Sequence, residues 1–240
     1  MNSVVIIPAL NPGAELPVYA RELLKSGLPR IVVVDDGSGA EYAEIFAEMA
    51  DLPLITVLRH KQNCGKGRAL KTAMEYILIS QYACDGVITV DADGQHSLAD
   101  VCRMAQALAS GNKEFVLGCR DFSLPGVPWR SRLGNRITSM MFKLLYGTYL
   151  PDTQTGLRGI PAWLLPYMLK IEGERFDYET SVLVELLYTG VKINHLAIET
   201  KYFDDNKGTN FSALRDTLRV ARALINGKWQ MANGKLNDKK

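Results

Sequence analysis

Hydrophobic and polar residues alternate in blocks along the chain, in a pattern typical of an α/β protein. Short runs of β-branched residues are separated by longer segments in which apolar residues recur every three or four positions. Strands are predicted at residues 4–7, 30–34, 54–58, 86–90 and 114–118, and helices at residues 15–26, 42–50, 67–81 and 98–110. This alternation predicts a mostly parallel sheet with helices on both faces.

The rhythm changes after about residue 120. Later elements are predicted, in order, at residues 124–129 (loop), 132–146 (helix), 152–159 (polar loop), 162–169 (helix), 178–190 (helix) and 191–200 (strand). No internal repeat or long linker marks a domain boundary. We therefore expect one domain over residues 1–229, followed by a polar tail at residues 230–240.

The strand predicted at residues 86–90 ends in two carboxylates, Asp91 and Asp93, with Gln95 behind them. Residues two apart in an extended chain point to the same side, so these oxygens can converge on one ligand. Ligation by oxygen alone suits a hard cation such as Mg²⁺ or Mn²⁺. A polar loop after a buried strand is the alternative, and the pair of aspartates by itself does not decide between the two.

Two further polar clusters, residues 8–11 and 35–38, also follow predicted strands. In parallel sheets ligands bind beyond the carboxyl ends of the strands, so we expect the three clusters to share one crevice. Asp36 could accept the imino N–H of uracil or guanine, or hold ribose hydroxyls. Helix capping by Asp36 or Ser38 is the alternative.

Two glycines and two cations, Gly65, Lys66, Gly67 and Arg68, directly precede a predicted helix. Such turns present backbone N–H groups to anions, and the cations suit a nucleoside diphosphate. The segment is neither a P-loop nor the G-x-G-x-x-G fingerprint of dinucleotide-binding folds.

Two later segments carry polar groups that suit a sugar or a phosphate. Gln154 and Thr155 lie in the polar loop at 152–159, where a solvated turn is the alternative. Asp177 and Glu179 open a predicted helix, where compensation of the helix dipole is the alternative. His96 is assigned to the loop or to a supporting position rather than to the metal.

Composition adds limits. A formal charge of +2 is too small to predict nucleic-acid binding. The four cysteines form no C-x-x-C pair, which is typical of reduced cysteines in a cytoplasmic protein. We find no signal-peptide pattern and no run of eighteen apolar residues.

Residues 213–229 show a basic amphipathic pattern. This pattern predicts a helix that either lies in the headgroup plane of a membrane or packs on the domain or a partner subunit.

Taken in order, these segments resemble the inverting glycosyltransferase family two, which has the GT-A fold, and within it the dolichyl-phosphate mannosyltransferase-like branch of polyprenyl-phosphate sugar transferases. The resemblance runs from residue 4 to about residue 220. It is carried by residues 8–11, 34–38, 65–70, 91–96, 118–120, 152–156 and 176–179.

The resemblance implies a metal-dependent transferase that moves a sugar from a UDP- or GDP-sugar to a lipid phosphate. It implies a nucleotide pocket formed by Pro8, Leu10, Asn11 and Asp36, with Lys66 and Arg68 close by. It also implies that Asp91, Asp93 and Gln95 hold the metal and the diphosphate, and that Arg120, Arg130 and Arg132 lie near the acceptor phosphate. The catalytic residues would be Asp93, Asp177 and Glu179. We expect no nucleic-acid partner. A peripheral contact with the inner face of the cell membrane and a homo-oligomer are left open.

Three departures from the family pattern stand out. Pro12 replaces the usual acidic residue after the first motif, and residues 206–211 lack the serine and histidine of a family run. Many relatives also continue into transmembrane helices. Two other functions are kept as alternatives: a sugar nucleotidyltransferase, whose glycine-rich N-terminal signature is missing here, and a non-catalytic module that binds nucleotide-sugars.

Overall fold

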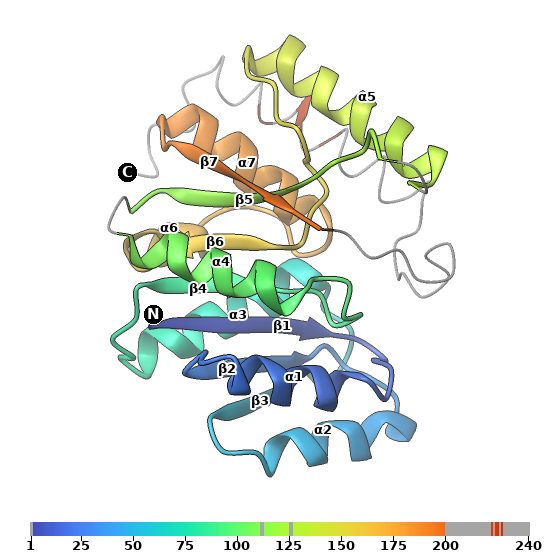
Figure 1. The fold of residues 1–240 in the computed structure, drawn as a ribbon, viewed down its shortest axis with the longest axis vertical. Coiled ribbons are helices and arrows are strands. Elements are labelled where there is room, and N and C mark those ends of the chain that lie inside the picture. Colours follow the sequence, from blue (N-terminus) through green and yellow to red (C-terminus); the bar gives the residue numbers. More distant parts are fainter. Residues whose placement is uncertain are drawn as a thin grey trace.

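The computed structural model describes residues 2–110, 113–124 and 127–199, together with residues 222, 224, 225 and 227. These residues form one seven-stranded sheet in the order β3-β2-β1-β4-β6-β5-β7 (Figure 1). The strands are β1 (Ser3–Ala9), β2 (Arg30–Asp35), β3 (Ile55–Arg59), β4 (Gly86–Thr89), β5 (Phe115–Arg120), β6 (Arg158–Pro161) and β7 (Ile193–Ile198). Only β6 runs antiparallel to its neighbours, so the mostly parallel sheet is confirmed.

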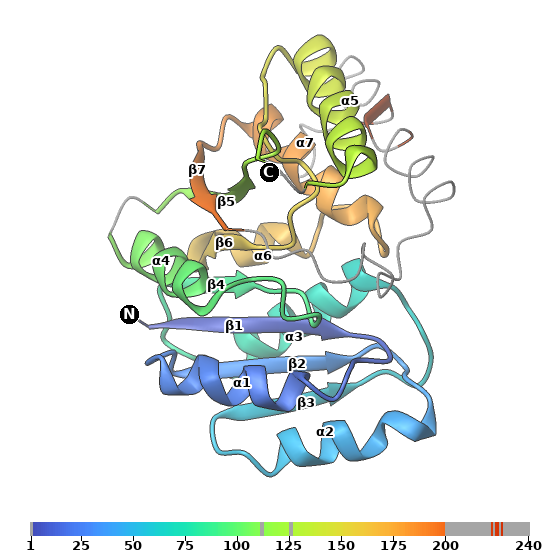
Figure 2. The same ribbon diagram turned by 45° about the vertical axis from the view of Figure 1, so that its right-hand side comes forward.

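Helices cover both faces of the sheet (Figures 1 and 2). They are α1 (Leu16–Lys25), α2 (Ala43–Ala50), α3 (Lys66–Ile79), α4 (Leu98–Ala109), α5 (Trp129–Tyr146), α6 (Leu165–Met168) and α7 (Asp177–Thr189), with short 3-10 turns at Ala40–Tyr42 and Ala162–Leu164. Alternate residues of each strand enter opposite cores. In β1, Val4 and Ile6 pack with α3, α6 and α7, while Val5 and Ile7 pack with α1, α2 and α4. Burial on both faces explains why the strands read as continuous apolar runs.

The predicted elements lie close to the observed ones, with one strand missed. Strand β6 begins in the last two residues of the segment that we predicted as a polar loop and continues past it. It was missed because it has an arginine, a glycine and a proline in only four residues. Helix α5 begins at Trp129 rather than at residue 132. The helix predicted at residues 162–169 is instead a 3-10 turn followed by the short α6.

The loops that follow β1 and β2 are bonded to each other at the carboxyl edge of the sheet. The backbone N–H of Asp36 donates to the Ala9 carbonyl at 2.8 Å. The N–H of Asn11 donates to Ser38 Oγ at 2.9 Å, and Asn11 Oδ1 accepts from the N–H of Gly39 at 3.2 Å. The first two polar clusters of the sequence therefore lie in contact.

No helix in the described residues is both long enough and apolar enough to cross a membrane. The segment 206–211 and the tail at 230–240 lie outside the described residues, as does most of the helix predicted at 213–229. Of that last segment, Leu224 is buried and its carbonyl accepts a hydrogen bond from Tyr146.

Candidate active site

Three segments that the sequence singled out separately meet at one ammonium group. Lys66, the first residue of α3, places Nζ 2.7 Å from Asp91 Oδ1 and 3.0 Å from Glu179 Oε2. Asp91 follows β4, and Glu179 lies in the first turn of α7. The structure thus joins the predicted donor-binding lysine, the predicted metal ligand and a predicted catalytic carboxylate in one ionic cluster.

The turn before α3 fixes where Lys66 starts. Asp36 Oδ2 accepts from the N–H of Gly65 at 2.8 Å, and Asp36 Oδ1 accepts from the N–H of Cys64 at 2.9 Å. Gly65 has φ of 105°, a left-handed value that favours glycine, and an added Cβ would overlap the carbonyl oxygen of Glu174. Asp36 therefore holds the turn that leads into α3, and its carboxylate bonds the two backbone N–H groups that precede the first residue of that helix.

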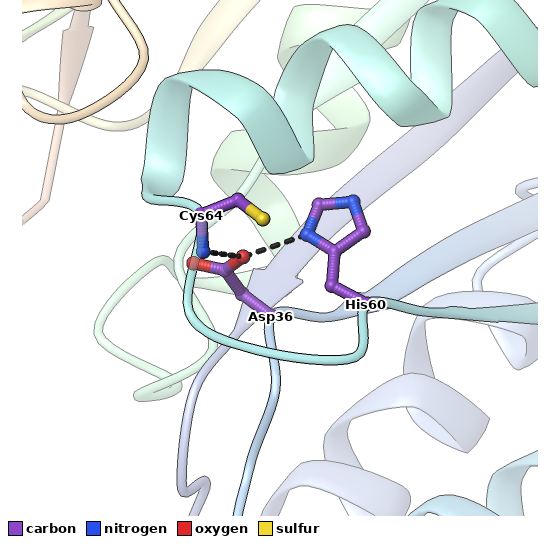
Figure 3. Close-up of side chains that lie close together, drawn as sticks. All are labelled: Asp36, His60 and Cys64. Atoms are coloured by element: carbon purple, nitrogen blue, oxygen red, sulfur yellow. Dashed lines mark hydrogen bonds and ion pairs between the residues drawn. The ribbon is translucent and has the colours of Figure 1, made fainter.

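Asp36, His60 and Cys64 bring together side-chain atoms of the kinds that bind metals, all within 4.8 Å of one another (Figure 3). These atoms already have hydrogen-bond partners. His60 Nδ1 lies 2.7 Å from Asp36 Oδ1, His60 Nε2 lies 3.0 Å from Thr72 Oγ1, and Cys64 Sγ donates to the Gln62 carbonyl at 3.3 Å. We assign this cluster to holding the turn. Asp36 and His60 are 24 residues apart in the sequence, so their contact depends on the fold.

The polar segment before β6 packs directly against Asp91. Thr89 Oγ1 donates to the Gly156 carbonyl at 2.6 Å, and a Cβ on Gly156 would overlap the Asp91 carboxylate. Thr155 is buried and its hydroxyl accepts from the N–H of Leu157 at 3.2 Å, while Gln154 is exposed. The absence of a side chain at Gly156 is what lets this segment approach the carboxylate.

Unsatisfied polar atoms gather around the ionic cluster. In the described part of the chain, five buried side-chain polar atoms lack a hydrogen-bond partner, and three of them are His96 Nε2, Arg158 Nη2 and Glu179 Oε1. His96 Nε2 lies 3.4 Å from Asp91 Oδ2, and Arg158 Nε lies 3.9 Å from Glu179 Oε1. Buried polar atoms without a hydrogen bond cost free energy, and ion pairs as long as these offset that cost only in part, so this place could accept further polar contacts from a ligand.

The two aspartates at the site differ in how much positive charge lies near them. Desolvation alone would raise the pKa of Asp91, but Lys66 and His96 hold that pKa well below its usual range. Desolvation would lower the pKa of Lys66, but Asp91 and Glu179 raise it. The pKa of Asp93 is raised, first by desolvation and then by the negative charge of Asp91. A second carboxylate that is short of positive charge beside an ionised one fits a divalent cation with oxygen ligands.

Other predicted site residues contact different partners. Arg68 pairs with Glu75 at 2.7 Å, and the N–H of Arg175 donates to Asp177 Oδ1 at 3.1 Å. The N–H of Gln95 donates to Asp93 Oδ1 at 3.0 Å. Their roles toward a ligand remain predictions.

The arginines predicted for an acceptor phosphate differ in their surroundings. The guanidinium of Arg120 donates two hydrogen bonds to Asp152, at 2.6 and 3.0 Å, and its backbone N–H donates a third at 3.2 Å. Arg132 donates to the Leu124 carbonyl at 3.3 Å. The side chain of Arg130 lies outside the described part of the structure.

Comparison with known protein families gives the identity of the domain. Residues 4–162 match the family model described as glycosyl transferase family 2, and this stretch is more than half of the chain. The chain belongs to this family. It is a glycosyltransferase, and the resemblance drawn from the sequence motifs is confirmed.

Similar proteins agree with this glycosyltransferase assignment. The UDP-N-acetylglucosamine–dolichyl-phosphate N-acetylglucosaminyltransferase of Methanococcus voltae is 26% identical over 225 residues, covering 86% of this chain and 89% of that protein. The undecaprenyl-phosphate 4-deoxy-4-formamido-L-arabinose transferase of Pectobacterium atrosepticum is 27% identical over 217 residues, covering 87% of this chain and 62% of that protein. Glucosyl-3-phosphoglycerate synthase from Mycobacterium tuberculosis, solved with Mn²⁺, UDP and glucosyl-3-phosphoglycerate, has a TM-score of 0.68 at 16% identity, covering 95% of this chain and 80% of that chain. The last likeness confirms the GT-A-type fold.

Two residues close to this ionic cluster, Arg158 and Gly156, were not named individually as site residues from the sequence, although their segment was interpreted as suited to a sugar or a phosphate. His96 was assigned to the loop or to a supporting position, and it lies beside Asp91. Tyr19, on α1, supports the site by donating to the His96 carbonyl at 2.7 Å. The spacing of apolar residues cannot predict that Arg158 is buried in a four-residue strand, because its hydrogen-bond partner Glu179 comes from another segment of the fold.

Proposed function

We propose that this glycosyltransferase moves a sugar from a nucleoside diphosphate sugar to a polyprenyl phosphate, with inversion at the anomeric carbon. The observation that supports this most is the cluster of Lys66, Asp91 and Glu179 at the carboxyl edge of the sheet. Similarity to a dolichyl-phosphate transferase and to an undecaprenyl-phosphate transferase supports the choice of acceptor.

The donor diphosphate would bind between Asp91 and the turn before α3. Asp91, Asp93 and Gln95 would hold Mg²⁺ or Mn²⁺, which neutralises charge on the diphosphate leaving group. The ammonium group of Lys66, which pairs with two carboxylates in this structure, would also pair with the donor phosphates. The nucleobase would lie along Pro8, Leu10 and Asn11, close to Asp36. A solved neighbour of the same fold that was crystallised with both Mn²⁺ and UDP supports the choice of a divalent metal and a nucleoside diphosphate as ligands.

A phosphate acceptor simplifies the chemistry at the attacking oxygen. The second pKa of a phosphate monoester is about 6, so this oxygen is largely anionic at neutral pH. The reaction then needs no strong general base. Glu179 would orient Lys66 and Arg158, and Asp177 would serve a similar positioning role on the acceptor side.

Replacing Lys66 with methionine should weaken donor binding by about tenfold to a hundredfold, because a hydrogen bond to a charged phosphate contributes roughly 1.5–3 kcal/mol. Titration calorimetry with UDP- and GDP-sugars in the presence of Mn²⁺ measures this. Lys192→Met is the matched control, since Lys192 pairs with Glu114 and its side chain is 72% exposed. An unchanged dissociation constant in Lys66→Met would contradict the assignment.

Replacing Glu179 with glutamine should reduce transfer to a lipid phosphate by only about tenfold, because no general base is required. With a hydroxyl acceptor the loss should instead reach about 10²- to 10⁴-fold. Turnover is measured together with the unfolding temperature. The control Glu185→Gln removes a second buried carboxylate of α7, which accepts a hydrogen bond from Tyr167 at 2.8 Å.

A panel of UDP-, GDP- and dTDP-sugars tests the donor half of the proposal. We expect one nucleotide class to raise the unfolding temperature, and to do so more strongly when Mn²⁺ is present. No stabilisation by any nucleotide-sugar would contradict it. Release of pyrophosphate from an NTP and a sugar 1-phosphate would identify a sugar nucleotidyltransferase instead, and donor binding without turnover would favour a non-catalytic module.

A further inference from the structure

A second group of side chains with metal-binding atoms follows β2 and β3 rather than β4. Asp36, His60 and Cys64 each offer one ligand atom, and these atoms lie within 4.8 Å of one another (Figure 3). They differ in kind from the oxygen ligands predicted at Asp91 and Asp93, because imidazole and thiolate groups suit borderline and soft cations such as Zn²⁺ better than Mg²⁺. We therefore consider this group as a candidate site for a different metal.

The distances fit a zinc site after small movements of the side chains. Zinc bonds of about 2.0–2.3 Å place neighbouring ligand atoms of a tetrahedral site roughly 3.5 Å apart. His60 Nδ1 and Asp36 Oδ1, now 2.7 Å apart, would separate by about 0.8 Å, and ligand atoms up to 4.8 Å apart would approach by up to about 1.3 Å. His60 and Cys64 are only partly buried, so rotation of their side chains can supply these shifts.

Further hydrogen bonds already orient two of the candidate ligands. The Asp36 carboxylate accepts from the backbone N–H groups of Cys64 and Gly65, at 2.9 and 2.8 Å. In the tautomer that carries its proton on Nε2, His60 donates to Thr72 Oγ1 at 3.0 Å and leaves the lone pair of Nδ1 facing Asp36. Histidine and carboxylate ligands of metal sites are held by outer partners of this kind.

The charges of the group also match a divalent cation. Binding would release the thiol proton of Cys64 to the solvent, and the thiolate and the Asp36 carboxylate would together neutralise the metal. The bond lost is a weak one, from Cys64 Sγ to the Gln62 carbonyl at 3.3 Å. Without a metal, the hydrogen bonds described above hold the turn with the same side chains.

We propose that Asp36, His60 and Cys64 bind Zn²⁺, with water in the fourth position, and that bound Zn²⁺ weakens binding of the nucleotide-sugar. The second half of this statement rests on the proposed function, whereas the metal site does not. In that function the nucleobase lies close to Asp36 and the donor phosphates lie close to Lys66. A metal on Asp36 would take negative charge away from the imino N–H of a base and would fix the turn that leads to Lys66.

Titration with Co²⁺ tests the metal site, because a cysteine thiolate bound to Co²⁺ gives an intense near-ultraviolet band that oxygen ligands do not give. The full 240-residue chain is kept reduced, in excess Mg²⁺ so that sites made of oxygen ligands are occupied. We expect a thiolate band that saturates at one Co²⁺ per chain and disappears when Zn²⁺ displaces the Co²⁺. Zn²⁺ should also raise the unfolding temperature.

Single substitutions assign the band to this group. Cys64→Ser should remove it and lower the affinity for Zn²⁺ by at least about a hundredfold, because losing a group that only orients a ligand already costs about 10- to 100-fold. Thr72→Val, which removes such an orienting group, should cost about tenfold. Asp93→Ala should keep the band, since Asp93 belongs to the other predicted metal site.

Cys84→Ser is the matched control. Cys84 is partly buried like Cys64, but it precedes β4 at the opposite edge of the sheet, and among the described residues it belongs to no group of metal-binding side chains. This variant should keep both the band and the affinity for Zn²⁺. The unfolding temperature of each variant without metal shows that it is folded.

Donor binding tests the second half of the proposal. In excess Mg²⁺, saturating Zn²⁺ should raise the dissociation constant of the nucleotide-sugar by about tenfold or more in the wild type, within the usual range for coupled sites, and should have no such effect in Cys64→Ser.

Each outcome has one meaning. Absence of the band, its survival in Cys64→Ser, or an equal loss in Cys84→Ser would overturn the metal site. A band with unchanged donor affinity would overturn the inhibition alone. If no nucleotide-sugar binds the chain in Mg²⁺ without Zn²⁺, the proposed function fails while the metal site stands.

Discussion

Replacing Asp91 with asparagine should reduce sugar transfer by about a thousandfold or more while the protein remains folded. Asparagine keeps the shape of the side chain but removes the charge that Lys66 and a divalent cation would share. Loss of about 4 kcal/mol of transition-state stabilisation corresponds to this factor. Steady-state turnover with the preferred donor, and the unfolding temperature of the variant, measure both parts of the prediction.

This experiment has two controls, a matched substitution elsewhere in the protein and removal of the divalent metal. Asp51→Asn changes an exposed aspartate at the end of α2 and should leave turnover unchanged. EDTA should abolish the wild-type activity, and added Mn²⁺ or Mg²⁺ should restore it. Full turnover in EDTA, or in Asp91→Asn, would show that these carboxylates do not hold a required metal.

Replacing Gly156 with alanine should lower the affinity for Mn²⁺ by about tenfold to a hundredfold, the range seen when groups that orient metal ligands are disturbed. The new Cβ would overlap the Asp91 carboxylate, so that carboxylate must move. The clash is with the flexible end of a side chain, so we expect little change in the unfolding temperature. Calorimetric titration of Mn²⁺, with and without the donor nucleotide, measures the effect.

Gly134→Ala is the control for this substitution. Among the described residues outside its own stretch of helix, the atom nearest to a Cβ at Gly134, in α5, would be Gln154 Nε2, at 3.8 Å. Alanine there should stabilise the helix by roughly 0.5–1 kcal/mol and leave metal binding unchanged. Unaltered Mn²⁺ affinity in Gly156→Ala would show that the close approach of this segment to Asp91 has no functional role.

The sheet and its covering helices were largely predictable because the pattern that encodes them is local. Strands such as β1 and β2 are apolar on both faces, and the helices between them repeat at helical spacing. Strand β6 carries no such signal. Arg158 is buried there only because the carbonyls of Thr155 and Glu179 accept its hydrogen bonds, and Glu179 belongs to another element.

The candidate site shows the same division between local and tertiary information. Each polar motif was visible in the sequence, since glycines and charged residues follow predicted strands. The sequence did not reveal that Lys66 would bridge Asp91 and Glu179, or that Asp36 would be occupied by the turn before α3. Such pairings depend on how α3, β4 and α7 pack around one edge of the sheet, which no motif encodes.

The measurement that tests the proposed reaction most directly is analysis of the product formed on a lipid phosphate. The full chain is incubated with Mn²⁺, the preferred nucleotide-sugar and a polyprenyl phosphate, and the organic extract is examined by mass spectrometry and NMR. We expect one glycosyl lipid phosphate with inverted anomeric configuration for each nucleoside diphosphate released, and no product from the corresponding polyprenol. Transfer to the polyprenol alone, or a product with retained configuration, would contradict the proposed function.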